Sequence, residues 1–130
     1  MAKGFAYSVG LVYVVLGAVG FGPTGFEQWL EADTGDHLIW FQLNPTQNFL
    51  HLVLGVVLLW SATEPPARAR AVVLLIGLVF GALGVAGFFL TGRPDSNVLA
   101  LNLADNLLHL ATGAAAIVVA ARPVVASART

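Results

Sequence analysis

The stretch AVVLLIGLVFGALGVAGFFL, residues 71–90, decides the fold class, because it runs without a single charged or strongly polar side chain. A helix needs about 20 residues to cross a hydrocarbon core of ~30 Å. A segment inside that core must also satisfy its backbone hydrogen bonds internally, which a helix does. The stretch is therefore predicted to be a transmembrane helix.

The composition of the whole chain points to the same environment. The 130 residues are 58% hydrophobic and 10% charged, whereas a soluble domain carries about 25% charged residues. The expected class is an integral membrane protein whose immediate partner is the lipid bilayer. A net charge of −1 gives no basic surface for nucleic acid. Because the chain has no cysteine, disulfides, thiolate metal ligands and cysteine nucleophiles are excluded.

Three further apolar segments accompany the first. The predicted spans are residues 5–21, 46–62, 71–90 and 98–121. They predict an all-α protein, a single transmembrane domain over residues 1–130 that folds as a four-helix bundle. The first span also has the length and basic start of a secretory signal peptide, but no small-residue cleavage signal follows it cleanly. We therefore expect it to be retained.

The charged residues predict the orientation. Basic residues gather before the first span, between the second and third, and after the fourth: Lys3, Arg68, Arg70, Arg122 and Arg129. The other two loops carry Arg93 and five acidic residues, Glu27, Glu31, Asp33, Asp36 and Asp95. Basic loops stay on the cytoplasmic side. Both termini are thus predicted in the cytoplasm, with the protein in the plasma (inner) membrane.

The chain repeats itself in two sets of spans. LNPTQNFLHLVLG, residues 43–55, returns as LNLADNLLHLATG, residues 101–113, and GLVYVVLGAVGF, residues 10–21, returns as GLVFGALGVAGF, residues 77–88. These matches predict a duplicated helical hairpin with units 5–62 and 71–121, related by a pseudo-two-fold axis along the membrane normal. The offsets of 58 and 67 residues differ because the first outer loop is longer. Its segment FEQWLEA, residues 26–32, is compatible with a short interfacial helix or with an ordinary exposed loop.

At these motifs the chain resembles the domain of unknown function 4383 family of small four-span bacterial membrane proteins. The resemblance lies in the two copies of Asn-x-x-His-Leu-x-x-Gly at residues 48–55 and 106–113, together with Asn44-Pro45 and Asp105-Asn106. It extends over roughly residues 5–121, including the glycine-rich first and third spans. The resemblance implies a four-span membrane fold, and it implies no activity.

Polar residues form one stripe along each copy of the repeat. Asn44, Asn48 and His51 are four and three residues apart, so they share one helix face. Seven residues at ~1.5 Å each place the histidines ~10 Å deeper than the outer interface. The predicted buried polar network, or ligand site, comprises Asn44, Asn48, His51, Asn102, Asp105, Asn106 and His109. We expect its asparagines and histidines to bond one another across the bundle axis.

Several functions are compatible with such a stripe. It can be architectural, aligning two helices that lipid cannot align. It can hold haem b through His51 and His109 as axial ligands, with Gly55 and Gly113 making room for the porphyrin. It can also admit a quinone or a lipid head group from the outer side. A metal site is not predicted, because two imidazoles and Asp105 leave a closed site one ligand short.

The favoured interpretation is a non-enzymatic accessory or interaction protein without a cofactor. A haem b-binding or other ligand-binding redox protein that uses His51 and His109 is the alternative. No serine, histidine and acid constellation or nucleotide-binding motif is found in the sequence, so no catalytic residue is assigned.

Glycines recur along the spans. The predicted helix-packing residues are Gly10, Gly17, Gly20, Gly55, Gly77, Gly81, Gly84, Gly87 and Gly113. Small residues allow membrane helices to approach closely. We expect them to pack the bundle internally; the alternative is that they form the face of a homo-oligomer or of a larger membrane complex.

Overall fold

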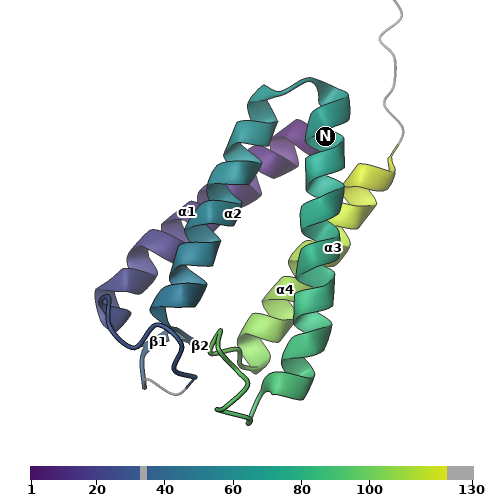
Figure 1. The fold of residues 1–130 in the computed structure, drawn as a ribbon. Coiled ribbons are helices and arrows are strands. Elements are labelled where there is room, and N and C mark those ends of the chain that lie inside the picture. The colour runs from purple at the N-terminus through teal and green to yellow at the C-terminus, as the bar shows by residue number, and fades with distance from the viewer. Residues whose placement is uncertain (33–34, 123–130) are drawn as a thin grey trace, which may run out of the picture.

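The computed structural model describes residues 1–32 and 35–122, which form four long helices and one small β-hairpin (Figure 1). The helices are α1 (Ala2–Thr24), α2 (Pro45–Thr63), α3 (Pro66–Leu90) and α4 (Leu103–Ala121). The strands β1 (His37–Leu38) and β2 (Phe41–Gln42) pair antiparallel. All four helices are long and apolar enough to cross a bilayer. The predicted all-α, four-span fold is therefore confirmed.

The helix starts depart most from the predicted spans at α3, which begins at Pro66 and not at residue 71, and at α4. This helix begins at Leu103 and not at residue 98. The preceding residues form a loop, because the Asn97 side chain accepts a hydrogen bond from the Leu101 nitrogen at 2.9 Å. Ala100 in the same loop has a φ of 50°, which interrupts a helix. The apolar residues of this loop fold back over the bundle, and both Ala100 and Leu101 are buried.

The helices form two hairpins that stand side by side. α1 packs along α2 and α3 packs along α4, and in Figure 1 α1 and α4 lie behind α2 and α3. α1 also contacts α3 and α4, and α2 contacts α3, whereas the backbones of α2 and α4 do not approach closely in the described part of the chain. α2 and α4 are thus the diagonal pair, as expected for an up-down bundle.

Glycines set the close approach within each hairpin. A β-carbon on Gly10 would lie 2.9 Å from the carbonyl oxygen of Gly55, and one on Gly77 would lie 3.1 Å from the carbonyl oxygen of Gly113. Similar backbone or side-chain collisions would follow at Gly17, Gly20, Gly55, Gly84, Gly87 and Gly113. A β-carbon on Gly81 would meet nothing within 4 Å, although its backbone nitrogen packs on Gly113. These glycines therefore pack the two hairpins internally.

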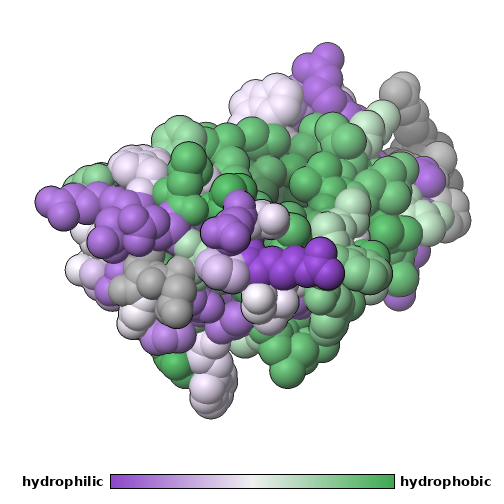
Figure 2. All heavy atoms as spheres, turned by 60° about the horizontal axis from the view of Figure 1, so that its bottom comes forward, coloured by the Kyte–Doolittle hydropathy of each residue, from purple (hydrophilic) through white to green (hydrophobic). Residues whose placement is uncertain are grey.

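The inner half of the bundle is closed by apolar packing. Tyr13 from α1 and Phe80 from α3 lie with ring centroids 4.8 Å apart and join the hairpins at the centre. Around and below them pack the buried residues Ala6, Leu58, Val73, Ile76, Ala116 and Ala120. The outside is apolar too: Figure 2 shows hydrophobic residues along the flank and hydrophilic residues gathered at the loop end. This distribution fits a bundle surrounded by lipid.

The first outer loop contains no helix over its described residues 25–32, so the interfacial helix considered for residues 26–32 is wrong. The chain turns at Gly25, which has a φ of 58° that glycine adopts readily. The Phe26 ring then stacks on Phe21 with centroids 4.8 Å apart. Gln28 also has a positive φ, 51°. The aromatic contacts hold this segment as a turn against the end of α1.

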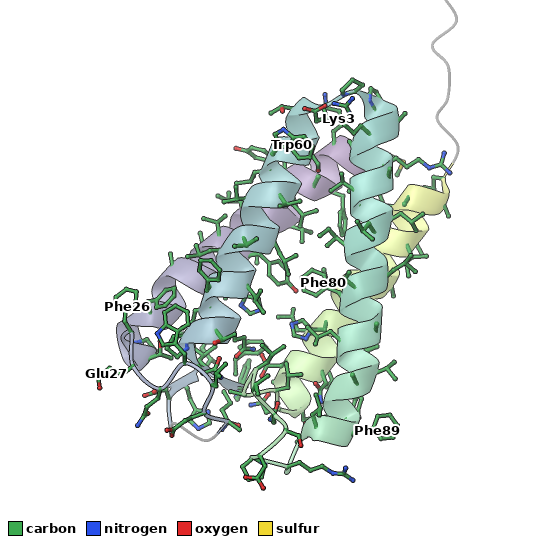
Figure 3. The ribbon with its side chains drawn as sticks, viewed as in Figure 1. Lys3, Phe26, Glu27, Trp60, Phe80 and Phe89 are labelled. Atoms are coloured by element: carbon green, nitrogen blue, oxygen red, sulfur yellow. The ribbon has the colours of Figure 1, made fainter. Side chains whose placement is uncertain are left out.

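The charged residues separate between the two ends of the bundle. Lys3 lies at the end where α1 begins and α4 finishes, and Glu27 lies at the opposite end, beside the outer loops (Figure 3). Arg68 at the first end is paired with Glu64 at 2.5 Å. Asp33 and Arg129, which contributed to the predicted orientation, lie outside the described residues.

Candidate functional site

The outermost polar residues of the stripe begin the helices. The Asn44 side-chain oxygen accepts a hydrogen bond from the Gln47 nitrogen at 2.9 Å, and that of Asn102 accepts one from the Asp105 nitrogen at 3.1 Å. The Asp105 carboxylate in turn accepts a hydrogen bond from the Asn102 nitrogen at 3.2 Å, which completes a capping box. Asparagine is a favoured N-cap because it satisfies a free backbone donor. Asn44 and Asn102 are therefore helix caps at corresponding positions of the repeat.

One polar contact joins α2 and α4 directly. The Gln47 side-chain nitrogen donates to the Asp105 carboxylate at 2.7 Å, and both residues are buried. The two residues stand 58 positions apart, so they correspond in the repeat and meet at its axis. Asp105 is thus a buried acid that makes three hydrogen bonds with two residues, Gln47 and Asn102, and none of these bonds is to an imidazole.

The next pair of asparagines is tied within the hairpins. The Asn48 side chain donates to the Thr24 hydroxyl at 2.9 Å, and the Asn106 side chain donates to the Thr91 hydroxyl at 3.1 Å. Each threonine hydroxyl donates in turn to a carbonyl oxygen one turn earlier in its helix. The expectation that these asparagines bond the histidines across the axis is wrong, because each points toward the glycine-rich helix of its own hairpin.

Sequence reasoning missed the two threonines. They end the segments GFGPT, residues 20–24, and GFFLT, residues 87–91, which keep the 67-residue offset of the repeat. Extending the aligned segments by three residues beyond Phe21 and Phe88 would have found them. The bond between Gln47 and Asp105 was not predicted either, because it depends on the distance between α2 and α4, which the repeat alone does not give.

The two histidines meet at the centre of the bundle. His51 and His109 are 5% and 1% exposed, and their ring centroids lie 6.0 Å apart at 68°. Tyr13 contacts His51 edge-on at 5.1 Å, and Phe80 stacks on His109 at 5.3 Å, with an angle of 18° between the rings. The predicted juxtaposition of the two imidazoles is thus present, and aromatic rings hold them in place.

The imidazoles carry polar atoms without partners. The Nδ1 atoms of both rings and the Nε2 atom of His109 are buried and have no hydrogen-bond partner among the described residues. The side-chain oxygen of Gln47 is in the same situation. Leaving a buried polar group unpaired costs about 1–3 kcal/mol. The side-chain oxygens of Asn48 and Asn106 are unpaired in the same way, and buried polar groups of this kind are usually satisfied by ordered water or by a ligand.

A cavity of about 540 Å³ lies beside the histidines, between α2 and α3. His51, His109 and Gln47 are the polar residues beside it, but almost all of its accessible wall is apolar and is formed by side chains of α2, α3 and the loop before α4. Leu50, Val53 and Val79 line it and are 38%, 40% and 43% exposed. The cavity therefore opens sideways through the bundle wall, toward lipid. Figure 3 shows Phe80 directed from α3 into the space between the two hairpins.

The geometry between the imidazoles does not favour haem. A porphyrin in that gap would have to displace the bond between Gln47 and Asp105 on one side or the contact between Tyr13 and Phe80 on the other. Gly55 was expected to leave space for the porphyrin, but α1 occupies the space beside it, because a β-carbon on Gly55 would lie 2.7 Å from the Val14 nitrogen. Gly113 packs against α3 in the same way. Haem ligation by His51 and His109 remains a prediction.

These features define a small membrane protein of four helices, built from a duplicated hairpin that places two histidines beside a lateral cavity. The model of the family described as Domain of unknown function (DUF4383) matches residues 3–122, and the chain belongs to this family. No curated protein and no solved structure matches the chain significantly.

Proposed function

We propose that this protein binds an uncharged, lipid-soluble small molecule in the cavity between α2 and α3. The observation that carries the proposal is the coincidence of two features at one place. An apolar cavity of about 540 Å³ opens toward lipid, and two histidines whose buried ring nitrogens lack partners are among the residues that line it. Ligand sites typically combine a predominantly apolar lining with a few converging polar groups.

The lining argues for a ligand without charge. None of the described residues that line the cavity is acidic, and none is a lysine or an arginine. Arg93 lines a separate space at the outer loops. A charged group moved into such surroundings without a counter-ion would lose most of its hydration energy. A phospholipid head group is therefore disfavoured relative to an alcohol, a phenol, a quinol or a quinone.

The imidazoles argue for a hydroxyl or a carbonyl on that ligand. A neutral imidazole offers one donor and one acceptor, so the pair can bond a group of either kind. Gln47 adds an acceptor oxygen at the same wall. The apolar part of the ligand would lie along Leu50 and Val53 on one side and Ala82 and Ala86 on the other.

A pair of probes that differ by one hydroxyl tests this proposal. In lipid nanodiscs we expect saturable binding of 4-nonylphenol, about 2–10-fold tighter than that of nonylbenzene, since a net hydrogen bond contributes ~0.5–1.5 kcal/mol. The variant His51→Leu/His109→Leu should bind both probes equally. Absence of saturable binding, or a preference that survives in this variant, would contradict the proposal.

The assembly and location of the protein are proposed on separate grounds. The accessory or interaction role, as a homo-oligomer or within a larger membrane complex, stays a prediction that crosslinking in native membranes can test. The segregation of Lys3, Arg68, Arg70 and Arg122 supports a plasma-membrane protein with both termini in the cytoplasm.

A further inference from the structure

The repeat gives the open cavity a counterpart. α4 corresponds to α2 and α1 corresponds to α3, so the groove between α4 and α1 is the equivalent of the cavity between α2 and α3. The residual space in that second groove is about 10 Å³, against about 540 Å³ in the first. Two copies of one hairpin have therefore formed one open groove and one closed groove.

The two grooves are built from corresponding residues. Six of the seven residues around the closed groove are Leu16, Phe41, Leu43, His51, Asp105 and Leu108. At the offsets of the repeat they correspond to Leu83, Leu99, Leu101, His109, Gln47 and Leu50, and all of these line the open cavity. The seventh, Leu38, has no such counterpart. The closed groove is thus a second copy of the same site with one addition.

The β-hairpin of the long first loop closes the second groove. Leu38 in β1 and Phe41 in β2 both line the residual space, with β1 against α1 and β2 against α4. Phe41 places an aromatic ring at the position where the open cavity has the smaller side chain of Leu99. The hairpin lies in the loop that is longer than its counterpart, so the additional chain and the closure occur together.

The helices beside the two grooves also differ. Val15 and Val19 of α1 stand 67 residues before Ala82 and Ala86, which line the open cavity. The Tyr13 hydroxyl donates to the Thr112 hydroxyl at 3.2 Å and ties α1 to α4. The equivalent residues across the open cavity are Phe80 and Leu54, which have no groups for such a bond.

We infer that the groove between α1 and α4 is a second ligand site which the chain fills with its own Leu38 and Phe41. The inference rests on the proposed function, and it adds that the protein takes up its uncharged ligand through one side only, between α2 and α3. Phe41 then occupies the place that a ring or chain of the ligand takes in the open cavity.

Truncating Leu38 and Phe41, the two side chains of the β-hairpin that fill the closed groove, tests the inference. In lipid nanodiscs we expect Leu38→Ala/Phe41→Ala to double the amount of 4-nonylphenol bound at saturation, as measured by native mass spectrometry. The matched control is Ile39→Ala, which changes an exposed residue of the same β-hairpin that lines neither groove, and it should leave the amount unchanged. If Leu38→Ala/Phe41→Ala does not fold, Phe41→Ala alone removes the larger of the two side chains from the same groove and has to raise the amount bound.

The outcomes separate the two proposals. If the folded variants bind no more probe than the unsubstituted protein does, the inference is overturned while the proposed function stands. If the unsubstituted protein shows no saturable binding, the proposed function fails. An increase in both the Leu38→Ala/Phe41→Ala variant and the Ile39→Ala control would also overturn the inference, because it would show nonspecific uptake.

Discussion

At the scale of single residues, the glycine-asparagine contact is the most sensitive feature of each hairpin. Gly87 of α3 faces the Asn106 side chain so closely that a β-carbon would overlap its amide oxygen. The same amide donates to the Thr91 hydroxyl at 3.1 Å. A methyl group at residue 87 would therefore push the amide away from its hydrogen-bond partner as well as from the helix.

Gly87→Ala is accordingly expected to destabilise the protein by ~1–3 kcal/mol, the usual cost of overpacking a core. Denaturant unfolding in detergent micelles, followed by circular dichroism, measures the change. Gly81→Ala is the matched control in the same helix, because a β-carbon there meets nothing within 4 Å. Equal stabilities of the two variants would show that the close contact has no energetic role.

At the scale of helices, the walls of the cavity set its size. Ala82 and Ala86 of α3 line the cavity and are exposed toward lipid, so larger side chains there would not disturb the buried core. We expect Ala82→Leu/Ala86→Leu to fold normally and to lose most of its 4-nonylphenol binding. The matched control Ala114→Leu changes an exposed residue of α4, which is not among the cavity's lining residues. Undiminished binding in the first variant would place the probe elsewhere.

Much of the helical arrangement could be predicted from the sequence, because apolar length and internal repetition act on long segments. The polar stripe also placed His51 and His109 together, since helical spacing and equal depth suffice for that. The partners of Asn48 and Asn106 could not be predicted, because the direction of a side chain depends on which neighbouring helix is close. The size of the cavity depends on small differences between the two copies of the repeat, such as Ala82 where the first copy has Val15. An alignment of the repeat treats such a difference as minor.

At the scale of the whole molecule, the two ends of the bundle differ in charge. The proposed orientation, with both termini in the cytoplasm, rests on Lys3, Arg68, Arg70 and Arg122 at one end, because basic residues near spans are retained on the inner side. The opposite end, with the β-hairpin and the residues near Asp95, then faces outward. The cavity lies between the level of the histidines and this outer end, since residues of the loop before α4 also line it.

Cysteine labelling checks this orientation directly, because the chain contains no cysteine and the unsubstituted protein serves as the blank. Asp95→Cys and Ala67→Cys place single thiols at exposed positions of the two opposite ends. A membrane-impermeant maleimide should label Asp95→Cys in intact cells and Ala67→Cys only after the membrane is disrupted. The reverse labelling pattern would show that the protein has the opposite orientation in the membrane. The cavity would then lie in the cytoplasmic half of the bilayer, and a ligand would have to reach it from the inner leaflet.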